Sequence, residues 1–148
     1  MLIPGHSSLA AAKDLFTRAG RPNLFIKIPG TKEGLPVIEE AIVAGVPVNV
    51  TLLFNREHYL AAAAAFLRGI ERRLEANLNP SVGSVASVFV SRWDGAVAGK
   101  VPDNLKNKLG IDALAAQLQD EGAKSFVKSW NELMSVIASK SNTMKPGK

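Results

Sequence analysis

The stretch NLFIKIPGTKEGLPVIEEAIVAGVPVNVTLL, residues 23–53, decides the fold because two apolar runs in it enclose a segment with helical periodicity. The first run, residues 23–28, is short and ends at a Pro-Gly pair, which predicts a buried strand. Apolar residues then recur at helical spacing over 33–44, with Thr31 as the expected N-cap. The β-branched run at 46–53 predicts a second strand.

Elements of the same two kinds flank this unit on both sides. A helix is expected over 7–19 before it, and a second helix over 56–76 after it, with Asn55 as N-cap and an apolar stripe that includes Tyr59 and Leu74. Another apolar run predicts a third strand over 85–90. The resulting β-α-β-α-β order is typical of an α/β fold with a parallel sheet, and it fits both doubly wound sheets and barrels.

The last third of the sequence predicts helix and no further strand. One helical stretch covers 112–120, the Glu-Gly pair at 121–122 is expected to break it, and a strongly amphipathic helix follows over 123–139. Residues 140–148 carry three lysines and no acid, and they are expected to form a flexible basic tail. The expected organisation is therefore a single domain over 1–139 followed by that tail.

Composition and charge exclude several functional classes. The 148 residues are 47% hydrophobic and 21% charged, which is typical of a globular domain. The sequence has no Cys and two His, so we expect no disulfide scaffold, no cysteine nucleophile and no metal site. The net charge is +5, of which three charges belong to the tail, and basic residues do not interleave with aromatic ones. A nucleic-acid-binding module is therefore not favoured.

The sequence also bears on location. Its longest apolar run is too short to span a bilayer, so no membrane association is expected. The first residues lack the basic region and apolar stretch of a signal peptide. A cytoplasmic location is therefore expected.

Lys27 is the most unusual residue because it interrupts an apolar strand. Burial disfavours the charged ammonium and lowers the pKa of a lysine. A neutral amine on a rigid strand can attack a carbonyl carbon and form a Schiff base. The alternative interpretation is that Lys27 lies near the end of the strand and extends its amine into water.

Further polar side chains are expected at the ends of the neighbouring strands. Asn49 and Thr51 share one face of the second strand because side chains alternate. Ser87 and Phe89 share a face of the third strand, and Arg92 follows it. Local hydrogen bonds for the polar pair and a surface ion pair for the arginine are the structural alternatives. Because ligands of parallel α/β folds bind at the carboxyl ends of strands, the set predicts a site for a phosphorylated carbonyl compound.

Three motifs in order carry a resemblance to a known family: RPNLFIKIPGTKEGLPVIEEAI, VPVNVTLLF and SVASVFVSRWD. They resemble the transaldolases from about Arg21 to Ile111, and EGAKSFVKSWNELM resembles the C-terminal helix of that family. The resemblance implies a partial (β/α)8 TIM barrel and a class I aldol transfer through a lysine Schiff base. A dihydroxyacetone unit would pass from fructose 6-phosphate or sedoheptulose 7-phosphate to an aldose phosphate, in the pentose phosphate pathway. No cofactor is implied, because the lysine iminium accepts the electrons.

The resemblance also implies roles for single residues. Lys27, in FIKIPGT, would be the Schiff-base lysine, and Thr51 would help to position the water that relays protons. The implied substrate-binding residues are Asn49 and Ser87 for the hydroxyls of the dihydroxyacetone unit, Phe89 for the pocket wall, and Arg92, in FVSR, for the substrate phosphate.

The sequence departs from the family pattern on both sides of these motifs. The family has three strands before the lysine strand, which supply an Asp, an Asn and a Glu, and two strands after the arginine-bearing one. Here one expected helix precedes Lys27, and near Ile111 the sequence passes directly to the terminal helix. We therefore expect a shortened transaldolase whose three strands cannot close a barrel. Its open edges would favour a homo-oligomer or a complementing chain. The alternative function is an impaired remnant that binds phosphosugars or assembles with another chain.

Overall fold

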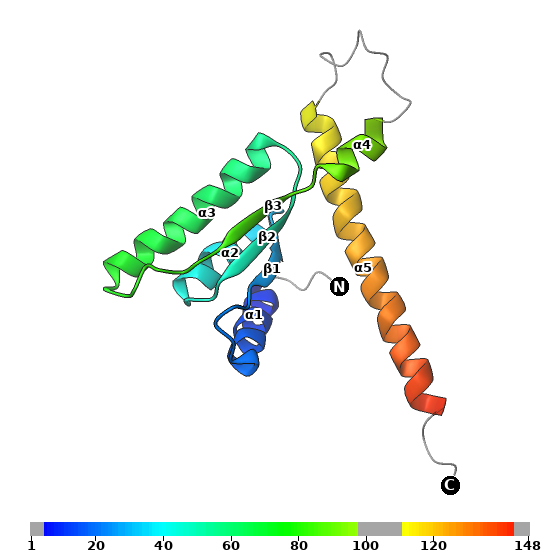
Figure 1. The fold of residues 1–148 in the computed structure, drawn as a ribbon, viewed down its shortest axis with the longest axis horizontal. Helices are drawn as coiled ribbons and strands as arrows, with labels where there is room; N and C mark the ends of the chain where they lie inside the picture. Colours follow the sequence, from blue (N-terminus) through cyan, green and yellow to red (C-terminus); the bar gives the residue numbers. More distant parts are fainter. Residues whose placement is uncertain (1–4, 98–110, 144–148) are drawn as a thin grey trace.

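The structure, a computed structural model, alternates strands and helices along the first two thirds of the chain (Figure 1). It describes residues 5–97 and 111–143, so the end of the expected tail lies outside the described residues. The elements are α1 (Gly5–Ala19), β1 (Ile26–Pro29), α2 (Gly34–Val43), β2 (Val48–Leu53), α3 (Arg56–Glu75), β3 (Val85–Val88), α4 (Ser91–Val97) and α5 (Ile111–Thr143).

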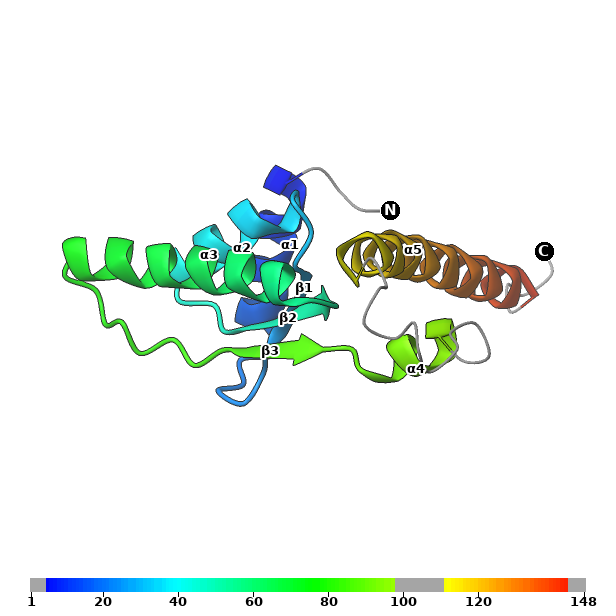
Figure 2. The ribbon, with the colours of Figure 1, turned by 90° about the horizontal axis from the view of Figure 1, so that it is seen from above.

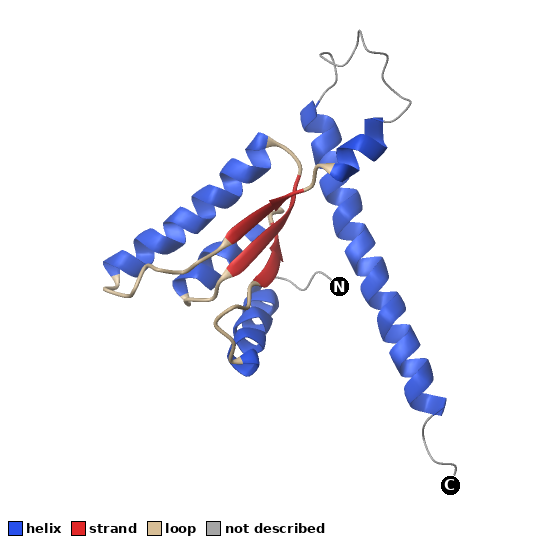
Figure 3. Ribbon diagram, viewed as in Figure 1, coloured by secondary structure: helices blue, strands red, loops and turns tan. Residues whose placement is uncertain are grey.

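The three strands, red in Figure 3, form one parallel sheet in the order β1-β2-β3. Helices α2 and α3 connect successive strands and lie on the same face of the sheet (Figure 2). α1 packs against α2 and β1. A parallel sheet with its crossover helices on one face is the arrangement found in the wall of a TIM barrel. The expected α/β class, with a partial barrel of about three strands, is therefore confirmed.

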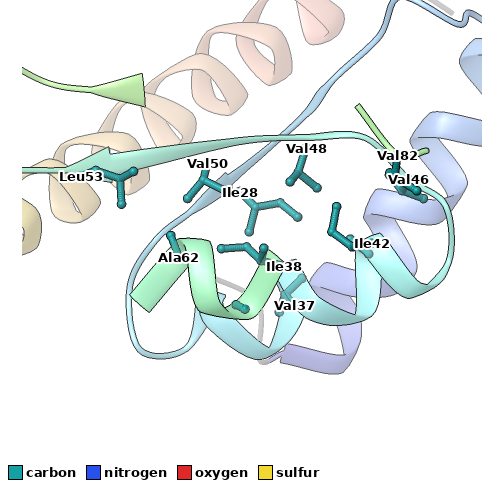
Figure 4. Close-up of a cluster of buried hydrophobic side chains, with 12 residues drawn as sticks. Ile28, Val37, Ile38, Ile42, Val46, Val48, Val50, Leu53, Ala62 and Val82 are labelled. Atoms are coloured by element: carbon teal, nitrogen blue, oxygen red, sulfur yellow. The ribbon is translucent and has the colours of Figure 1, made fainter. Parts of the chain in front are cut away.

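The main core lies between the sheet and the helices α2 and α3 (Figure 4). Ile28 and Val48 point from the strands toward Ile38 and Ile42 of α2, and the last three of these side chains are fully buried. Gly69 of α3 makes the contact between the two helices close. A β-carbon at this position would lie 2.7 Å from Cβ of Ile42, so a larger residue would push the helices apart.

The expected inner face of α3 is wrong in part. Tyr59 and Leu74, predicted to point inward, are exposed. The buried positions of α3 are instead the small residues Ala62, Ala65 and Gly69. A helix that packs closely against another helix places small side chains at the contact, and this moves the larger apolar residues to the outside. Hydrophobic periodicity therefore predicted the helix and only part of its inner face, since the predicted residues Phe66 and Ile70 do pack against the core.

The expected N-cap of α3 is confirmed, whereas that of α2 lies two residues later than expected. The side chain of Asn55 accepts a hydrogen bond of 2.8 Å from the backbone N–H of His58, which confirms it as the N-cap of α3. Thr31 lies two residues before the N-cap position of α2, which is occupied by Glu33. Its hydroxyl still accepts from the backbone N–H of Gly34 at 3.3 Å, so Thr31 stabilises the same helix end.

Helix α5 runs without interruption through the predicted break at 121–122. Gly122 is buried inside this helix, and a β-carbon on it would lie 2.7 Å from Cδ2 of Leu52. The glycine therefore serves close packing and not chain reversal. No helix in the described ranges is long and apolar enough to cross a membrane.

The second half of α5 leaves the sheet, as Figure 1 shows. The apolar stripe predicted to face a core is exposed here, which corrects that expectation. Among the residues described, only Lys27 of β1 lies near this stripe, at its Phe126 end. Its exposed members, between 44% and 56% accessible, are Phe126, Trp130, Leu133, Met134 and Ile137.

Two acidic residues of α2 pair with arginines of α3. Nε of Arg68 lies 2.7 Å from Glu39, and Arg72 Nη1 lies 2.9 Å from Glu39 and 2.6 Å from Glu40. The hydrogen bond from Arg68 is the largest of the causes that lower the pKa of Glu39. These pairs join the outer edges of the two helices that cover the sheet.

Candidate functional site

Lys27 lies in the middle of β1 on the face of the sheet opposite the helices. Ile28 beside it is buried in the main core, and side chains alternate along a strand, so Lys27 points the other way. Its side chain is exposed, which makes the expectation of a desolvated amine wrong and the alternative, an amine that reaches water, right. A strand with one covered face buries only every second residue.

The amine of Lys27 nevertheless has aromatic neighbours. Nζ lies 5.9 Å from the ring centre of Phe89 and 5.7 Å from the ring centre of Phe126. Both distances fall within the range in which an aromatic ring attracts a cation. The two rings come from different parts of the fold, since Phe89 follows β3 and Phe126 belongs to α5.

Asn49 and Ser87 form a polar pair beside Lys27. Asn49 is the register partner of Lys27 on β2. The hydroxyl of Ser87 donates a hydrogen bond of 2.8 Å to Oδ1 of Asn49, and both residues are half-buried. This bond uses the amide oxygen of Asn49, so its N–H groups remain as donors for a ligand.

Thr51 carries a buried hydroxyl near the end of β2. Its side chain is 2% exposed, and its Oγ1 has no hydrogen-bond partner among the residues described. A buried hydroxyl without a partner costs about 1–3 kcal/mol. Such an atom suits a place where a water molecule or a ligand supplies the missing bond.

The backbone changes direction immediately after Thr51. Leu52 has φ +60°, and the register of β2 with β3 shifts between Val50 and Leu53. This bulge lets two consecutive leucines point into different clusters. Leu53 joins the main core, whereas Leu52 packs among residues of α5, including Ala115 and Leu118.

Phe89 and Arg92 stack at the end of β3. The ring of Phe89 lies 5.6 Å from that of Phe54, and Cζ of Arg92 lies 5.4 Å from the centre of Phe89. No described carboxylate lies within 4.0 Å of Arg92, so the ion-pair alternative is not observed in this part of the chain. The guanidinium thus remains available for an anionic ligand.

The structure thus brings most of the expected residues together. One ring, Phe89, contacts both cationic groups, Lys27 and Arg92, and the Asn49–Ser87 pair lies on the neighbouring strands. A nucleophilic amine, amide donors and a guanidinium can bind and attack a phosphorylated carbonyl compound. No group of metal-ligating side chains occurs within residues 5–97 and 111–143.

Two contacts from α5 were not expected from the sequence. Gln119 donates hydrogen bonds from Nε2 to the carbonyl oxygens of Gly30, at 3.2 Å, and Leu52, at 2.8 Å. Phe126 reaches Lys27 as described above. The apolar period marked Phe126 only as a core residue, and Gln119 lay just before the expected helix break. Reading residues 111–143 as one continuous helix through Gly122 would have placed Gln119 and Phe126 on the same helix.

Comparisons with known proteins agree on one family. A family model described as "Transaldolase/Fructose-6-phosphate aldolase" matches residues 6–111. The chain is 41% identical over 122 residues to "Transaldolase 2" of Nostoc punctiforme, a match that covers 82% of this chain and 32% of the relative. It is 45% identical over 113 residues to "Transaldolase 2" of Streptomyces coelicolor, covering 76% and 29%. It is 42% identical over 110 residues to "Transaldolase" of Neisseria meningitidis, a match that covers 74% of this chain and 31% of the relative. The chain spans about a third of the length of these relatives.

Proposed function

The chain belongs to the transaldolase/fructose-6-phosphate aldolase family, and from that premise we propose that it acts as a transaldolase with Lys27 as the Schiff-base lysine. It would transfer a dihydroxyacetone unit from fructose 6-phosphate or sedoheptulose 7-phosphate to an aldose phosphate, within the pentose phosphate pathway. The observation that supports this proposal best is the position of the Lys27 amine, which lies near two aromatic rings and beside the Asn49–Ser87 pair.

The proposed reaction begins when the neutral amine of Lys27 attacks the C2 carbonyl carbon of the ketose phosphate. The hydroxyl of the resulting carbinolamine takes a proton from solvent and leaves as water, which gives an iminium that accepts electrons. The C3–C4 bond then breaks, its electron pair forms an enamine, and the C4 hydroxyl gives its proton to a water molecule as the aldose phosphate leaves. The enamine carbon attacks the aldehyde of a second aldose phosphate, whose oxygen takes a proton back. Hydrolysis of the new iminium restores the amine, so the sequence of steps needs no cofactor.

The other residues would bind the substrate and position this water. The free amide donors of Asn49 and the hydroxyl of Ser87 suit the hydroxyls of the dihydroxyacetone unit, and Phe89 supplies an apolar wall. The guanidinium of Arg92 suits the phosphate because its planar donors match phosphate oxygens. The unpartnered hydroxyl of Thr51 suits the water that relays the proton.

Trapping with borohydride in the presence of fructose 6-phosphate tests the proposal. Borohydride reduces an iminium to a stable amine, so intact mass and peptide mapping should find the adduct on Lys27. Lys27→Met should lose it, whereas Lys32→Met, which changes an exposed lysine of the following loop, should keep it. A folded wild-type protein without adduct, or an equal adduct on the Lys27→Met variant, would refute the assignment. Where the adduct forms, release of the three-carbon aldose phosphate from fructose 6-phosphate in the presence of an acceptor aldose phosphate measures turnover.

A second candidate function is a phosphosugar-binding chain that assembles with a second copy of itself or with a complementing chain. The exposed apolar side chains of the sheet edge favour it, since Val85 is 46%, Val88 50% and Val90 67% accessible. Sedimentation of the purified chain should then give a mass above that of a monomer. A monomer at high concentration would exclude self-assembly, and ketose phosphate binding without adduct formation would favour the remnant over the enzyme.

We place the protein in the cytoplasm as part of the same proposal. Sugar phosphates are anionic and do not cross membranes unaided, so an enzyme that consumes them works where they are made. Cell fractionation tests this, and recovery in a membrane or secreted fraction would contradict it.

A further inference from the structure

We propose that Phe126 is a further residue of the site and that α5, anchored by Gln119, holds its ring against the Lys27 amine. This inference rests on the proposed function and deepens it. It names a side chain that stabilises the positive charge of the iminium. It also gives α5, which contributes no strand to the sheet, a function at the site.

The anchor is a single side-chain amide that bonds two strand ends. Nε2 of Gln119 donates to the carbonyl oxygen of Gly30, which follows β1, and to that of Leu52, near the end of β2. The same junction contains a backbone hydrogen bond of 2.7 Å from Gly30 N–H to Thr51 O. Gln119 therefore ties α5 to the strands that carry Lys27 and Thr51.

The residues that follow Gln119 on the same face of α5 keep the helix close to the strand ends. Positions three and seven residues further along a helix lie on one side, and here these are Gly122 and Phe126. A β-carbon on Gly122 would meet Leu52 Cδ2 at 2.7 Å and Arg92 Nη1 at 3.3 Å. The lack of a side chain at this position thus lets the helix pass over Leu52 and beside Arg92.

This path delivers the ring of Phe126 to the amine. Its centre lies 5.7 Å from Nζ of Lys27, and Phe89 faces the same nitrogen at 5.9 Å. The faces of aromatic rings attract cations, and the attraction is larger for a cation that binds less water. A second ring therefore favours the iminium over the free carbonyl compound and the more strongly hydrated ammonium group. Phe126 is 44% exposed, so burial in a core does not account for its position.

Removal of the ring should therefore weaken Schiff-base formation. We expect Phe126→Leu to reduce the borohydride-trapped adduct with fructose 6-phosphate by about two- to fivefold, the size of an exposed cation–π contact. Trp130→Leu is the matched control, because Trp130 is an exposed aromatic residue on the same helix one turn further along. It should leave trapping unchanged. Phe126→Tyr keeps the ring and should restore trapping, which a loss of general packing would not predict.

The anchoring role requires a separate test in the full chain. Gln119→Leu should reduce trapping in the wild-type background and have little further effect in the Phe126→Leu background, because it acts by placing the ring. Equal reductions in the two backgrounds would overturn this part of the inference. Circular dichroism of each variant distinguishes these outcomes from unfolding.

The two levels of the proposal fail in different ways. If the wild type forms no adduct, the proposed function itself is refuted. If the wild type forms the adduct and Phe126→Leu forms as much, the function stands and Phe126 has no part in it.

Discussion

β2 and β3 are neighbouring strands of one sheet with similar apolar sequences, VNVTLL and VASV, yet they differ in burial. Every residue of β2 except Asn49 is buried, whereas three of the four residues of β3 are exposed. β2 has a strand on each side, helices against one face and α5 near its carboxyl end, whereas β3 is an edge strand. The difference shows that position in the sheet, and not strand composition, determines how much a side chain contributes to stability.

The sharpest test of this comparison truncates one apolar side chain on each strand, at positions that are partners in the register of the sheet. Leu53→Ala removes a fully buried side chain from β2 and should lower the free energy of unfolding by about 2–5 kcal/mol. Val88→Ala, at a position that is 50% exposed on β3, should change it by less than about 0.5 kcal/mol. Urea unfolding followed by circular dichroism measures both. Equal losses would mean that another element covers β3 in solution.

A second test concerns the contact between β2 and α5. Gly122→Ala should lower the free energy of unfolding by about 1 kcal/mol, because overpacking against Leu52 outweighs the better helix propensity of alanine. Gly95→Ala in α4 is the matched control, since no atom lies within 4 Å of its added carbon. There the same change should raise the free energy of unfolding by about 0.5–1 kcal/mol. Thermal unfolding compares the two signs, and a stabilised Gly122→Ala would contradict the packing of α5 on Leu52.

The buried hydroxyl of Thr51 offers a third test, which separates stability from chemistry. Thr51→Val replaces an unpartnered hydroxyl with a methyl group of similar size and should leave the free energy of unfolding unchanged or raise it by up to about 1 kcal/mol. The same variant should release less product per unit of time, because the proposed water relay loses its hydroxyl. A variant that is destabilised instead would show that a protein group or a structural water bonds to Thr51.

The smallest expected effect is electrostatic and belongs to the helices behind β2. Arg68 and Arg72 lower the pKa of Glu39 below its ordinary value of 4.5. A carboxylate whose folded pKa is lowered adds stability above its unfolded pKa and loses it as the pH falls through the folded pKa. Unfolding measured from pH 6 down to pH 3 should therefore show a shallower acid loss for Glu39→Gln than for the wild type. Identical slopes would mean that the pair contributes nothing, as exposed pairs often do.

The same comparison explains which features were predictable from sequence. Periodic apolar runs placed all three strands and the helices α1, α2 and α3, because local pattern and tertiary packing agree there. The apolar runs likewise predicted that Lys27 and Asn49 lie on neighbouring strands and that Arg92 follows the third strand. The exposure of Lys27 was not predictable, because it depends on what covers the second face of the sheet.

Contacts between distant segments account for the other errors. The buried face of α3 depends on how closely Gly69 approaches Ile42, and the continuity of α5 depends on the contact between Gly122 and Leu52. Neither partner lies nearby in the sequence, so no local pattern records the contact. For the same reason, the positions of Gln119 and Phe126 at the site appeared only in the structure.

The long separation in sequence between Gln119 and its two acceptors also has a consequence for the order of events during synthesis. Gln119 bonds to carbonyl groups 89 and 67 residues earlier in the chain, whereas the strands and the helices between them contact their near neighbours. Segments with local contacts form quickly, and a chain emerges from the ribosome with its amino-terminal part first. The sheet and its helices are thus complete while Lys27 still faces open solvent. α5 is the last of these segments to be synthesised, and its arrival adds Phe126 to Phe89 as the second aromatic neighbour of Lys27.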